Sequence, residues 1–228
     1  MLLQVSGQTK LEIANRADLA QAFGELGVRV GPRTGPGARN HEEKEWWCLR
    51  RYVFTLSAAG QMEFPISIEK AERPDFRCKF GPCAVGIEVS EATDRSDQEA
   101  MTKFQQSGAP IALVGSFGGR FPRVAGSPEL SWQEDVLGAV RSKSQDFDSY
   151  TDPLPEYALL LYSNSNAASH IHDELWPRVF AGCDPMNEQI WEKARSDLKR
   201  VAVICGPWLL MLEPGSVLSY PVQSGVAE

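Results

Sequence analysis

The run "YALLLYS" (157–163) constrains the fold most, because it is apolar without interruption over the length of one strand. A strand that is half exposed alternates apolar and polar residues, whereas a strand covered on both faces reads as a continuous apolar run. The run therefore predicts a central strand with helices on both sides of its sheet. Helical and strand patterns alternate along the rest of the chain, so we expect an α/β sandwich with a mixed sheet.

The chain has 228 residues, enough for one large domain, and the whole chain is interpreted as a single α/β domain. A short helix is predicted near 15–27, a loop over 28–40 and a long helix from His41 to about Ala59. Three short strands follow at 64–71, 75–80 and 84–90, and a further helix at 131–147 leads into the apolar run. The expected core therefore covers about 41–163, with an N-terminal helix and loop over 1–40 and an insertion over about 107–130.

Beyond the core, helices are expected near 168–181 and 186–197, and two strands at 200–205 and 208–213. These make up a C-terminal part over 164–213, and the tail after Pro214 is expected to be loosely held. The N-terminal helix and the C-terminal strand pair are candidate dimerisation elements, so a homodimer is also considered.

No run reaches the roughly 20 apolar residues that a bilayer span needs. The five cysteines are scattered in hydrophobic surroundings, which suits buried, reduced thiols rather than a disulfide framework. We therefore expect a cytoplasmic protein that does not associate with a membrane.

The strand "AVGIEVS" carries an unexpected carboxylate. Its period of two sends Val85, Ile87 and Val89 to one face, and Glu88 with its neighbours Gly86 and Ser90 to the other. A glutamate is rarely buried unless it pairs or coordinates a cation, and Gly86 would leave room for a ligand or another backbone to approach.

Asp75 follows Pro74 at the start of the preceding strand, and the turn at Gly81 and Pro82 would bring Asp75 near Glu88. The two strands offer no evident Arg or Lys to lie between these carboxylates, so a divalent cation is expected to neutralise them. Mg²⁺, or Mn²⁺ in its place, is the natural candidate because it uses one or two carboxylates together with phosphate oxygens.

The motifs "RPDF" and "GIEVSEA", in a helix, strand, strand, strand, helix, strand order, resemble the PD-(D/E)xK nuclease superfamily with its restriction-endonuclease-like fold. The resemblance implies a metal-dependent nuclease in which Asp75 and Glu88 are metal ligands that activate water for phosphodiester hydrolysis. It also implies a further acidic residue from the first core helix, for which Glu45 is preferred over Glu42. A carboxylate that merely interacts with the helix dipole would explain Glu45 equally well.

The sequence departs from the family pattern at Ser90, where the family has a lysine two residues after the glutamate. Members of the superfamily can move this lysine to a following helix. Lys143 is the preferred substitute because it lies on the apolar stripe of the 131–147 helix, and Lys103 is the second choice. A lysine whose stem covers apolar surface at the helix edge would give the same pattern.

The net charge of −7 argues against a protein that coats nucleic acid through bulk attraction. Positive charge is nevertheless concentrated in Gly/Pro-rich segments, and Arg120 and Arg123 are candidate nucleic-acid contacts, although a solvated connector would look the same. Two functions follow: a nuclease acting on nucleic acid, with DNA preferred over RNA, or a catalytically inactive binding or interaction module of the same fold.

Overall fold

One mixed sheet organises the molecule. The computed structural model describes residues 10–26, 40–93, 127–147, 150, 153–164 and 166–223. Within these ranges eight strands pair in chain order, from β1 at one edge to β8 at the other. They are β1 (Lys10–Ile13), β2 (Ile66–Lys70), β3 (Phe76–Phe80), β4 (Cys83–Ala92), β5 (Glu156–Ser163), β6 (Leu198–Cys205), β7 (Trp208–Glu213) and β8 (Ser216–Pro221).

Two strand pairs in the middle of the sheet are parallel, β4 with β5 and β5 with β6, and the other pairs are antiparallel. Parallel neighbours need a crossover connection. The long helix α4 (Pro128–Asp146) lies between β4 and β5 in the chain, and α5 (Asn166–Ser169), α6 (Trp176–Phe180) and α7 (Asp184–Lys193) lie between β5 and β6.

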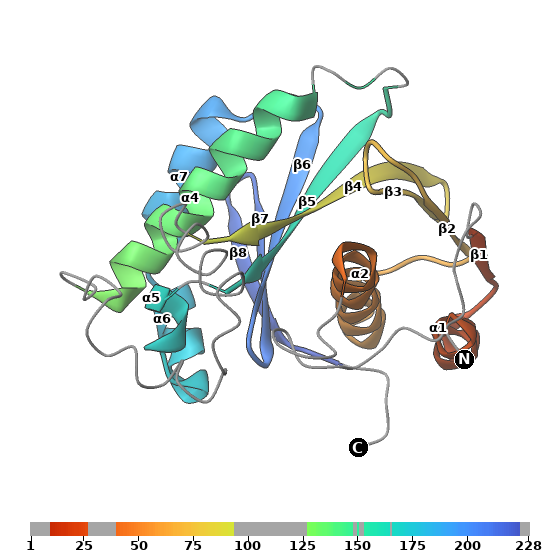
Figure 1. The fold of residues 1–228 in the computed structure, drawn as a ribbon, viewed down its shortest axis with the longest axis horizontal. Coiled ribbons are helices and arrows are strands. Elements are labelled where there is room, and N and C mark those ends of the chain that lie inside the picture. Colours follow the sequence, from red (N-terminus) through yellow and green to blue (C-terminus); the bar gives the residue numbers. More distant parts are fainter. Residues whose placement is uncertain are drawn as a thin grey trace, which may run out of the picture.

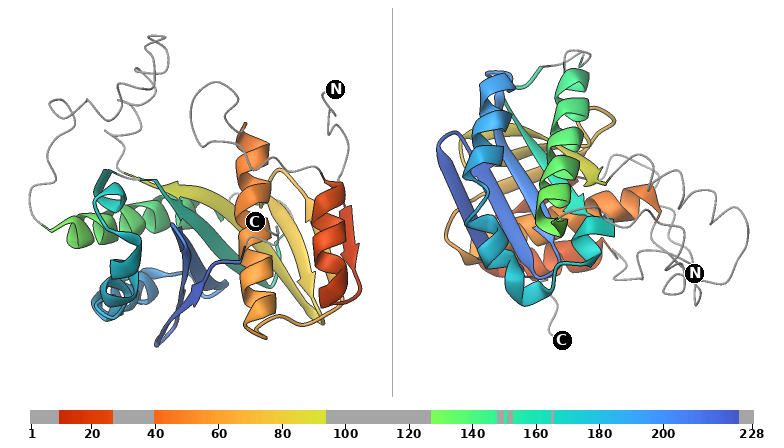
Figure 2. Two further views of the ribbon diagram at one scale, coloured as in Figure 1. Left: turned by 90° about the horizontal axis from the view of Figure 1, so that it is seen from below. Right: turned by 90° about the vertical axis from the view of Figure 1, so that its left-hand side faces the viewer.

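Helices cover both faces of the sheet (Figure 1). The helices α4, α6 and α7 pack on one face, and α2 (His41–Ala58) with the short α1 (Leu19–Glu25) packs on the other. Figure 2 shows α1 and α2 beside the strands of the N-terminal half, away from α4. The sheet is therefore the middle layer of a three-layer α/β arrangement.

Strand β5 contributes to two separate hydrophobic cores. Leu159 and Leu161 pack in the core under α4, whereas Ala158 and Leu160 pack in the core under α2. The prediction from the apolar run is thus confirmed: this strand is buried on both faces. The two faces of β4 also differ as predicted, since Ile87 and Val89 belong to the α2 core and Glu88 does not.

Side-chain caps fix the start of α2, which begins at the predicted residue. The Asn40 side chain accepts a hydrogen bond from the Glu43 N–H (2.8 Å), and the Glu43 carboxylate accepts one from the Asn40 N–H (2.9 Å). This reciprocal pair satisfies two N–H groups that a helix start leaves without partners. It fixes the start of α2, where His41 is the first helical residue and Glu45 lies one turn later.

Four predictions need correction. The tail after Pro214 is not loose, because β8 pairs with β7 along its whole length. The segment before residue 40 contains strand β1 as well as a helix, and β1 joins the edge of the sheet. Helix α4 begins at Pro128, so the end of the expected 107–130 insertion is helical, and Cys83 is exposed rather than buried.

Periodicity missed β1 and β8 because both are short edge strands, of four and six residues, with few buried residues: β1 buries only Ile13 and β8 buries none. The part of the expected insertion before residue 127 lies outside the described residues. Among the described helices, none has the length and apolar character that a membrane crossing would need.

Candidate metal-dependent active site

Asp75, the residue before β3, lies close enough to Glu88 of β4 to feel its charge. The first residue of β3, Phe76, pairs with Ile87, so continuing the register back by one residue brings Asp75 opposite Glu88. Strand β3 begins at Phe76, whereas β4 continues beyond Ile87 to Ala92. The N–H of Val89 donates to Asp75 Oδ2 at 2.7 Å, so a side chain takes the place of the next backbone partner. Asp75 is therefore anchored at the point where two strands part.

The turn that delivers Asp75 packs directly on β4. A Cβ atom at Gly86 would lie 2.8 Å from Pro74 Cγ and 2.7 Å from a ring carbon of Tyr157. The room expected at Gly86, for a ligand or another backbone, is filled by the chain itself through the rings of Pro74 and Tyr157. The missing side chain makes room for the ring of Pro74, which is the residue before Asp75.

Glu88 accepts hydrogen bonds on both of its carboxylate oxygens. Lys143 Nζ lies 2.9 Å from Oε1, and the Tyr150 hydroxyl donates to Oε2 at 2.8 Å. Lys143 comes from the last turn of α4, and its side chain is 30% exposed. Because each carboxylate oxygen has two lone pairs, both oxygens keep the capacity to accept a further donor or a cation.

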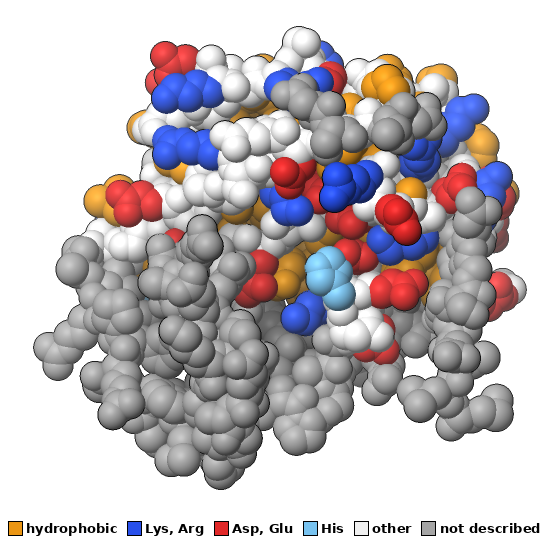
Figure 3. All heavy atoms as spheres, turned by 45° about the horizontal axis from the view of Figure 1, so that its top comes forward, with side chains coloured by type: hydrophobic (Ala, Val, Ile, Leu, Met, Phe, Trp, Pro, Cys, Tyr) orange, Lys and Arg blue, Asp and Glu red, His pale blue; other side chains and the backbone are white. Residues whose placement is uncertain are grey.

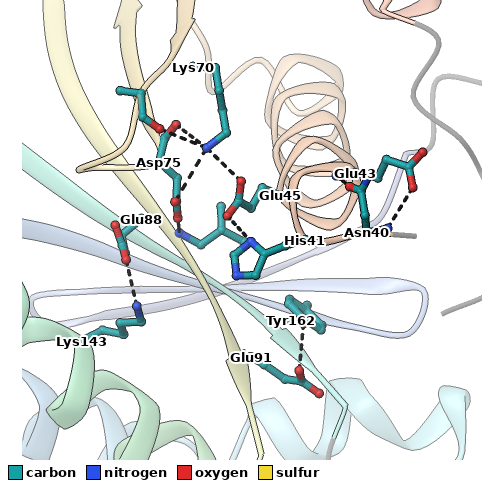
Figure 4. Close-up of polar contacts among 12 residues, drawn as sticks. Asn40, His41, Glu43, Glu45, Lys70, Asp75, Glu88, Glu91, Lys143 and Tyr162 are labelled. Atoms are coloured by element: carbon teal, nitrogen blue, oxygen red, sulfur yellow. Dashed lines mark hydrogen bonds and ion pairs between the residues drawn. The ribbon is translucent and has the colours of Figure 1, made fainter. Parts of the chain in front are cut away.

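Glu45 forms a second ion-paired group on the α2 side of Asp75 (Figure 4). Its carboxylate lies 2.6 Å from His41 Nδ1 and 2.8 Å from Lys70 Nζ, and the side chain is only 6% exposed. Lys70 Nζ also lies 3.8 Å from Asp75 Oδ1. Asp75 thus lies between Glu45 and Glu88, each of which is paired with a lysine. The carboxylate of Asp75 is farther from an ammonium than the carboxylate of either glutamate is.

The charges of this arrangement change the acidity of three groups. Burial, followed by the negative charge of Glu88, raises the pKa of Asp75 to about 7, although the Val89 N–H acts in the opposite direction. Burial is the largest influence on Lys143 and lowers its pKa, but the hydrogen bond to Glu88 and the negative charges of Glu88, Asp146 and Asp75 together raise the pKa of the ammonium. Burial and the same glutamate also raise the pKa of the Tyr150 hydroxyl. The charged form of Asp75 is therefore destabilised unless a cation joins it.

An open cleft of about 920 Å³ lies beside Asp75. Its lining is mixed in charge but mainly acidic, and consists of His41, Glu42, Glu45, Glu69, Lys70, Ala71, Glu72, Asp75 and Arg77. Figure 3 shows acidic and basic side chains intermixed on one face of the molecule. A bare phosphodiester would meet net negative charge in this cleft, so cations are needed for it to bind.

Four of the residues predicted from the sequence come together around Asp75, and of these only Asp75 and Glu45 line the cleft. Glu88 contacts Lys143, Asp75 lies across the strand pair from Glu88, and Glu45 joins the group through Lys70. Glu42 lines the cleft. Glu91 has its carboxylate on Tyr162 and Asn164, away from this group, as its opposite strand phase predicts. Arg120, Arg123 and Lys103 lie outside the described residues.

Sequence analysis missed Lys70, His41 and Tyr150. Lys70 lies on the same face of β2 as Ile66 and Ile68, which are fully buried. A lysine at the next position on a buried face was therefore a signal that the sequence offered. The spacing of His41 and Glu45, four residues apart on one helix face, was another. Tyr150 follows the end of α4, and no periodicity places it. The two carboxylates, expected to have no evident Arg or Lys between them, each have a lysine nearby: Lys70 Nζ lies 3.8 Å from Asp75 Oδ1 and Lys143 Nζ lies 2.9 Å from Glu88 Oε1.

The donor set of this site suits a hard cation that keeps several water ligands. Within the described ranges, no three His, Cys, Asp or Glu side chains are grouped closely enough to hold a metal ion by themselves. Asp75 and Glu88 would supply carboxylate oxygens, and Mg²⁺ commonly binds through one or two carboxylates with waters and phosphate oxygens completing its octahedron. The pair fits such an ion better than an ion that needs a complete protein cage.

Comparisons of the chain with protein-family models, with curated proteins and with solved structures found no match. The functional interpretation therefore depends on the geometry of these residues and on the motif resemblance.

Proposed function

We propose that this protein is a Mg²⁺- or Mn²⁺-dependent nuclease with a restriction-endonuclease-like core, acting on DNA in preference to RNA. The observation that carries the proposal is the position of Asp75, directly before β3 begins, next to Glu88 on the neighbouring strand. The order α2, β2, β3, β4, α4, β5 supports it, since this is the element order of that fold. A cytoplasmic location and a homodimer remain expectations.

The charge balance around Asp75 supports a divalent cation at this position. Glu45 and Glu88 each have an ammonium within 3 Å, whereas Asp75 relies on one N–H and an ammonium 3.8 Å away. A cation between Asp75 and Glu88 would relieve the repulsion that raises the pKa of Asp75. When bound, such an ion would lower the pKa of a coordinated water and stabilise negative charge on the phosphate.

The position of Lys143 supports it as a substitute for the family lysine, whose place in this chain is taken by Ser90. Its ammonium has three N–H donors, and one of them satisfies Glu88 Oε1. The raised pKa keeps it charged, and its partial exposure allows contact with a phosphate oxygen or an attacking water. In this proposal Lys143 orients the water and counters charge on the phosphate, while Tyr150 keeps the Glu88 carboxylate in place.

Divalent-cation binding is the direct test, by titration calorimetry with Mg²⁺ and Mn²⁺ on the wild type, Glu88→Ala and Glu91→Gln. Glu91 is the matched control because it is on the same strand with its carboxylate on the other face. We expect binding in the wild type and Glu91→Gln, and its loss in Glu88→Ala. Equal binding in all three proteins would place the ion elsewhere.

Cleavage is then assayed on single-stranded DNA, double-stranded DNA and RNA with and without chelator. Loss of cleavage in Asp75→Ala, with retention in Glu91→Gln, is the expected result. Full cleavage by Asp75→Ala, or cleavage that persists in excess chelator, would refute the proposal.

A non-catalytic module of the same fold is the second candidate. It is favoured by Ser90 and by the donors that already occupy both oxygens of Glu88. A docking module would be supported by a broad exposed apolar surface. Among the described residues, the exposed large apolar side chains are Leu130, Leu175 and Leu218, and three such side chains are too few to form one. Absence of both cation binding and cleavage would favour the module.

A further inference from the structure

We infer that Lys70 is a positioning residue that fixes the Asp75 carboxylate, a role that neither the motif pattern nor strand periodicity assigns. The inference deepens the proposed function, and its catalytic consequence depends on that function. Its structural part, the control of Asp75 by Lys70, can be tested without any activity.

The ammonium of Lys70 has an acceptor for each of its three N–H donors. Nζ lies 2.8 Å from Glu45 Oε2 and 3.1 Å from the backbone oxygens of both Ala71 and Asp75. The side chain is 18% exposed, and the ammonium lies 4.8 Å from the centre of the Phe76 ring. Lys70 is therefore held by the protein on several sides.

These contacts connect three parts of the site. Glu45 belongs to α2, Lys70 ends β2, and the two backbone oxygens belong to the turn that leads into β3. The Ala71 N–H donates to the Asp75 oxygen at 2.9 Å, and Lys70 adds a second donor to the same oxygen. The ammonium thus joins the two ends of the turn, at Ala71 and Asp75.

The turn sets the direction of the Asp75 side chain. Its Oδ2 atom accepts from the Val89 N–H at 2.7 Å, and a small rotation of the backbone at Asp75 would break this bond. Without the ammonium, two turn oxygens lose a donor and the buried Glu45 carboxylate keeps only its contact with His41, so the loss of these contacts favours rearrangement of the turn.

Lys70 differs from Lys143 in what it can still contact. The three donors of Lys70 are matched by three acceptors, which leaves none for substrate, whereas Lys143 is more exposed. Lys70 therefore acts through Asp75 and Glu45. A lysine suits this position because a compact ammonium directs donors to acceptors on several sides, which the planar fork of an arginine cannot do equally well.

The structural test is hydrogen exchange and chemical shift of the Val89 amide in Lys70→Met, with Lys79→Met as the control from an exposed position on β3. We expect exchange at Val89 to be about tenfold faster in Lys70→Met, as for loss of one buried hydrogen bond, and unchanged in Lys79→Met. Amides of β6 in the same samples report global opening. Unchanged Val89 exchange, or acceleration equal to that of β6, would overturn the inference.

Lys70→Arg and Lys70→Gln keep part of the donor set and provide the same readout if Lys70→Met does not fold. We expect intermediate Val89 exchange in both variants. Wild-type exchange in Lys70→Gln, which lacks the charge and has a shorter reach, would also overturn the inference.

The functional test is cation affinity and the kinetics of cleavage. For Lys70→Met we expect about a 10- to 100-fold loss of Mg²⁺ affinity or kcat, the size typical of residues that support ligands, with less than about a threefold change in KM. A change confined to KM would mean that Lys70 contacts substrate and does not position Asp75. If the wild type neither binds cation nor cleaves, the proposed function fails while the Val89 exchange still decides the role of Lys70.

Discussion

Pro74 packs against Gly86 so closely that the two residues determine together where Asp75 lies. A Cβ atom at residue 86 would lie 2.8 Å from Pro74 Cγ, a distance that real Cβ contacts do not show. Tyr157, on the other side of this position, is buried and stacked on Phe147, so it has little freedom to move away. Gly86 in the "GIEVSEA" motif therefore provides the space that Pro74 of the "RPDF" motif occupies.

Gly86→Ala is predicted to destabilise the protein by about 1–3 kcal/mol, the usual cost of overpacking, and to weaken cation binding by moving Asp75. Urea unfolding measures the first effect and titration calorimetry the second. Gly138→Ala is the matched control, because a Cβ there meets nothing within 4 Å in helix α4 and alanine is the better helix former. Wild-type stability of Gly86→Ala would contradict the packing argument.

The stability of the metal-free protein is predicted to depend on pH through Asp75. Its pKa in the folded protein is about 7, above the ordinary value of 3.8, so the folded state holds this proton more tightly than the unfolded state. The resulting stabilisation is complete below about pH 4 and is lost as the pH rises to about 7. Relative to Asp75→Asn, the unfolding free energy of the wild type should fall by a few kcal/mol, at most about 4, across this window.

Urea unfolding at pH 4.5, 6 and 8 in chelator measures this difference between the wild type and Asp75→Asn. Added Mg²⁺ at pH 8 should restore stability to the wild type and have less effect on the variant. A difference that stays constant with pH would show that Asp75 does not titrate in this range.

Tyr150→Phe is predicted to loosen Glu88. The change removes the donor to a buried carboxylate oxygen, which costs about 1–3 kcal/mol of stability. Loss of a supporting hydrogen bond should also weaken cation binding by about tenfold. Tyr162→Phe is the control, since Tyr162 donates to Glu91 on the other face of β4, and it should leave cation binding unchanged. Equal effects of the two variants on cation binding would exclude a specific role for Tyr150.

Lys143→Met is predicted to reduce kcat by about 10²–10³-fold, the size expected when one donor to developing charge is removed. Its stability should also fall by about 1–3 kcal/mol, because Lys143 is partly exposed but the Glu88 carboxylate that loses its ammonium is buried. Lys193→Met, at the same place in the last turn of α7, is the control and should keep full activity. Full activity of Lys143→Met would leave the site without a replacement for the lysine missing at Ser90.

Local patterns in the sequence determined which face each side chain uses. The apolar run of β5 required cover on both faces, and alternation in β4 placed Glu88 on the α4 face with Glu91 on the other. Helical periodicity also placed Lys143 on the side of α4 that meets the sheet. These features depend on the geometry of one element, which repeats every 3.6 or 2 residues whatever its neighbours are.

Only the tertiary structure decided which of those side chains meet. The pairing of Lys70 with Glu45 joins β2 to α2, the donation from Tyr150 to Glu88 depends on the residues after α4, and β8 became a strand through its pairing with β7. Periodicity gives the face of the element on which a side chain lies, but not the residue of the neighbouring element that it meets. A lysine side chain is also long enough to reach several different acceptors. The environment of Asp75, between two lysine-paired glutamates, is therefore a property of the packed elements.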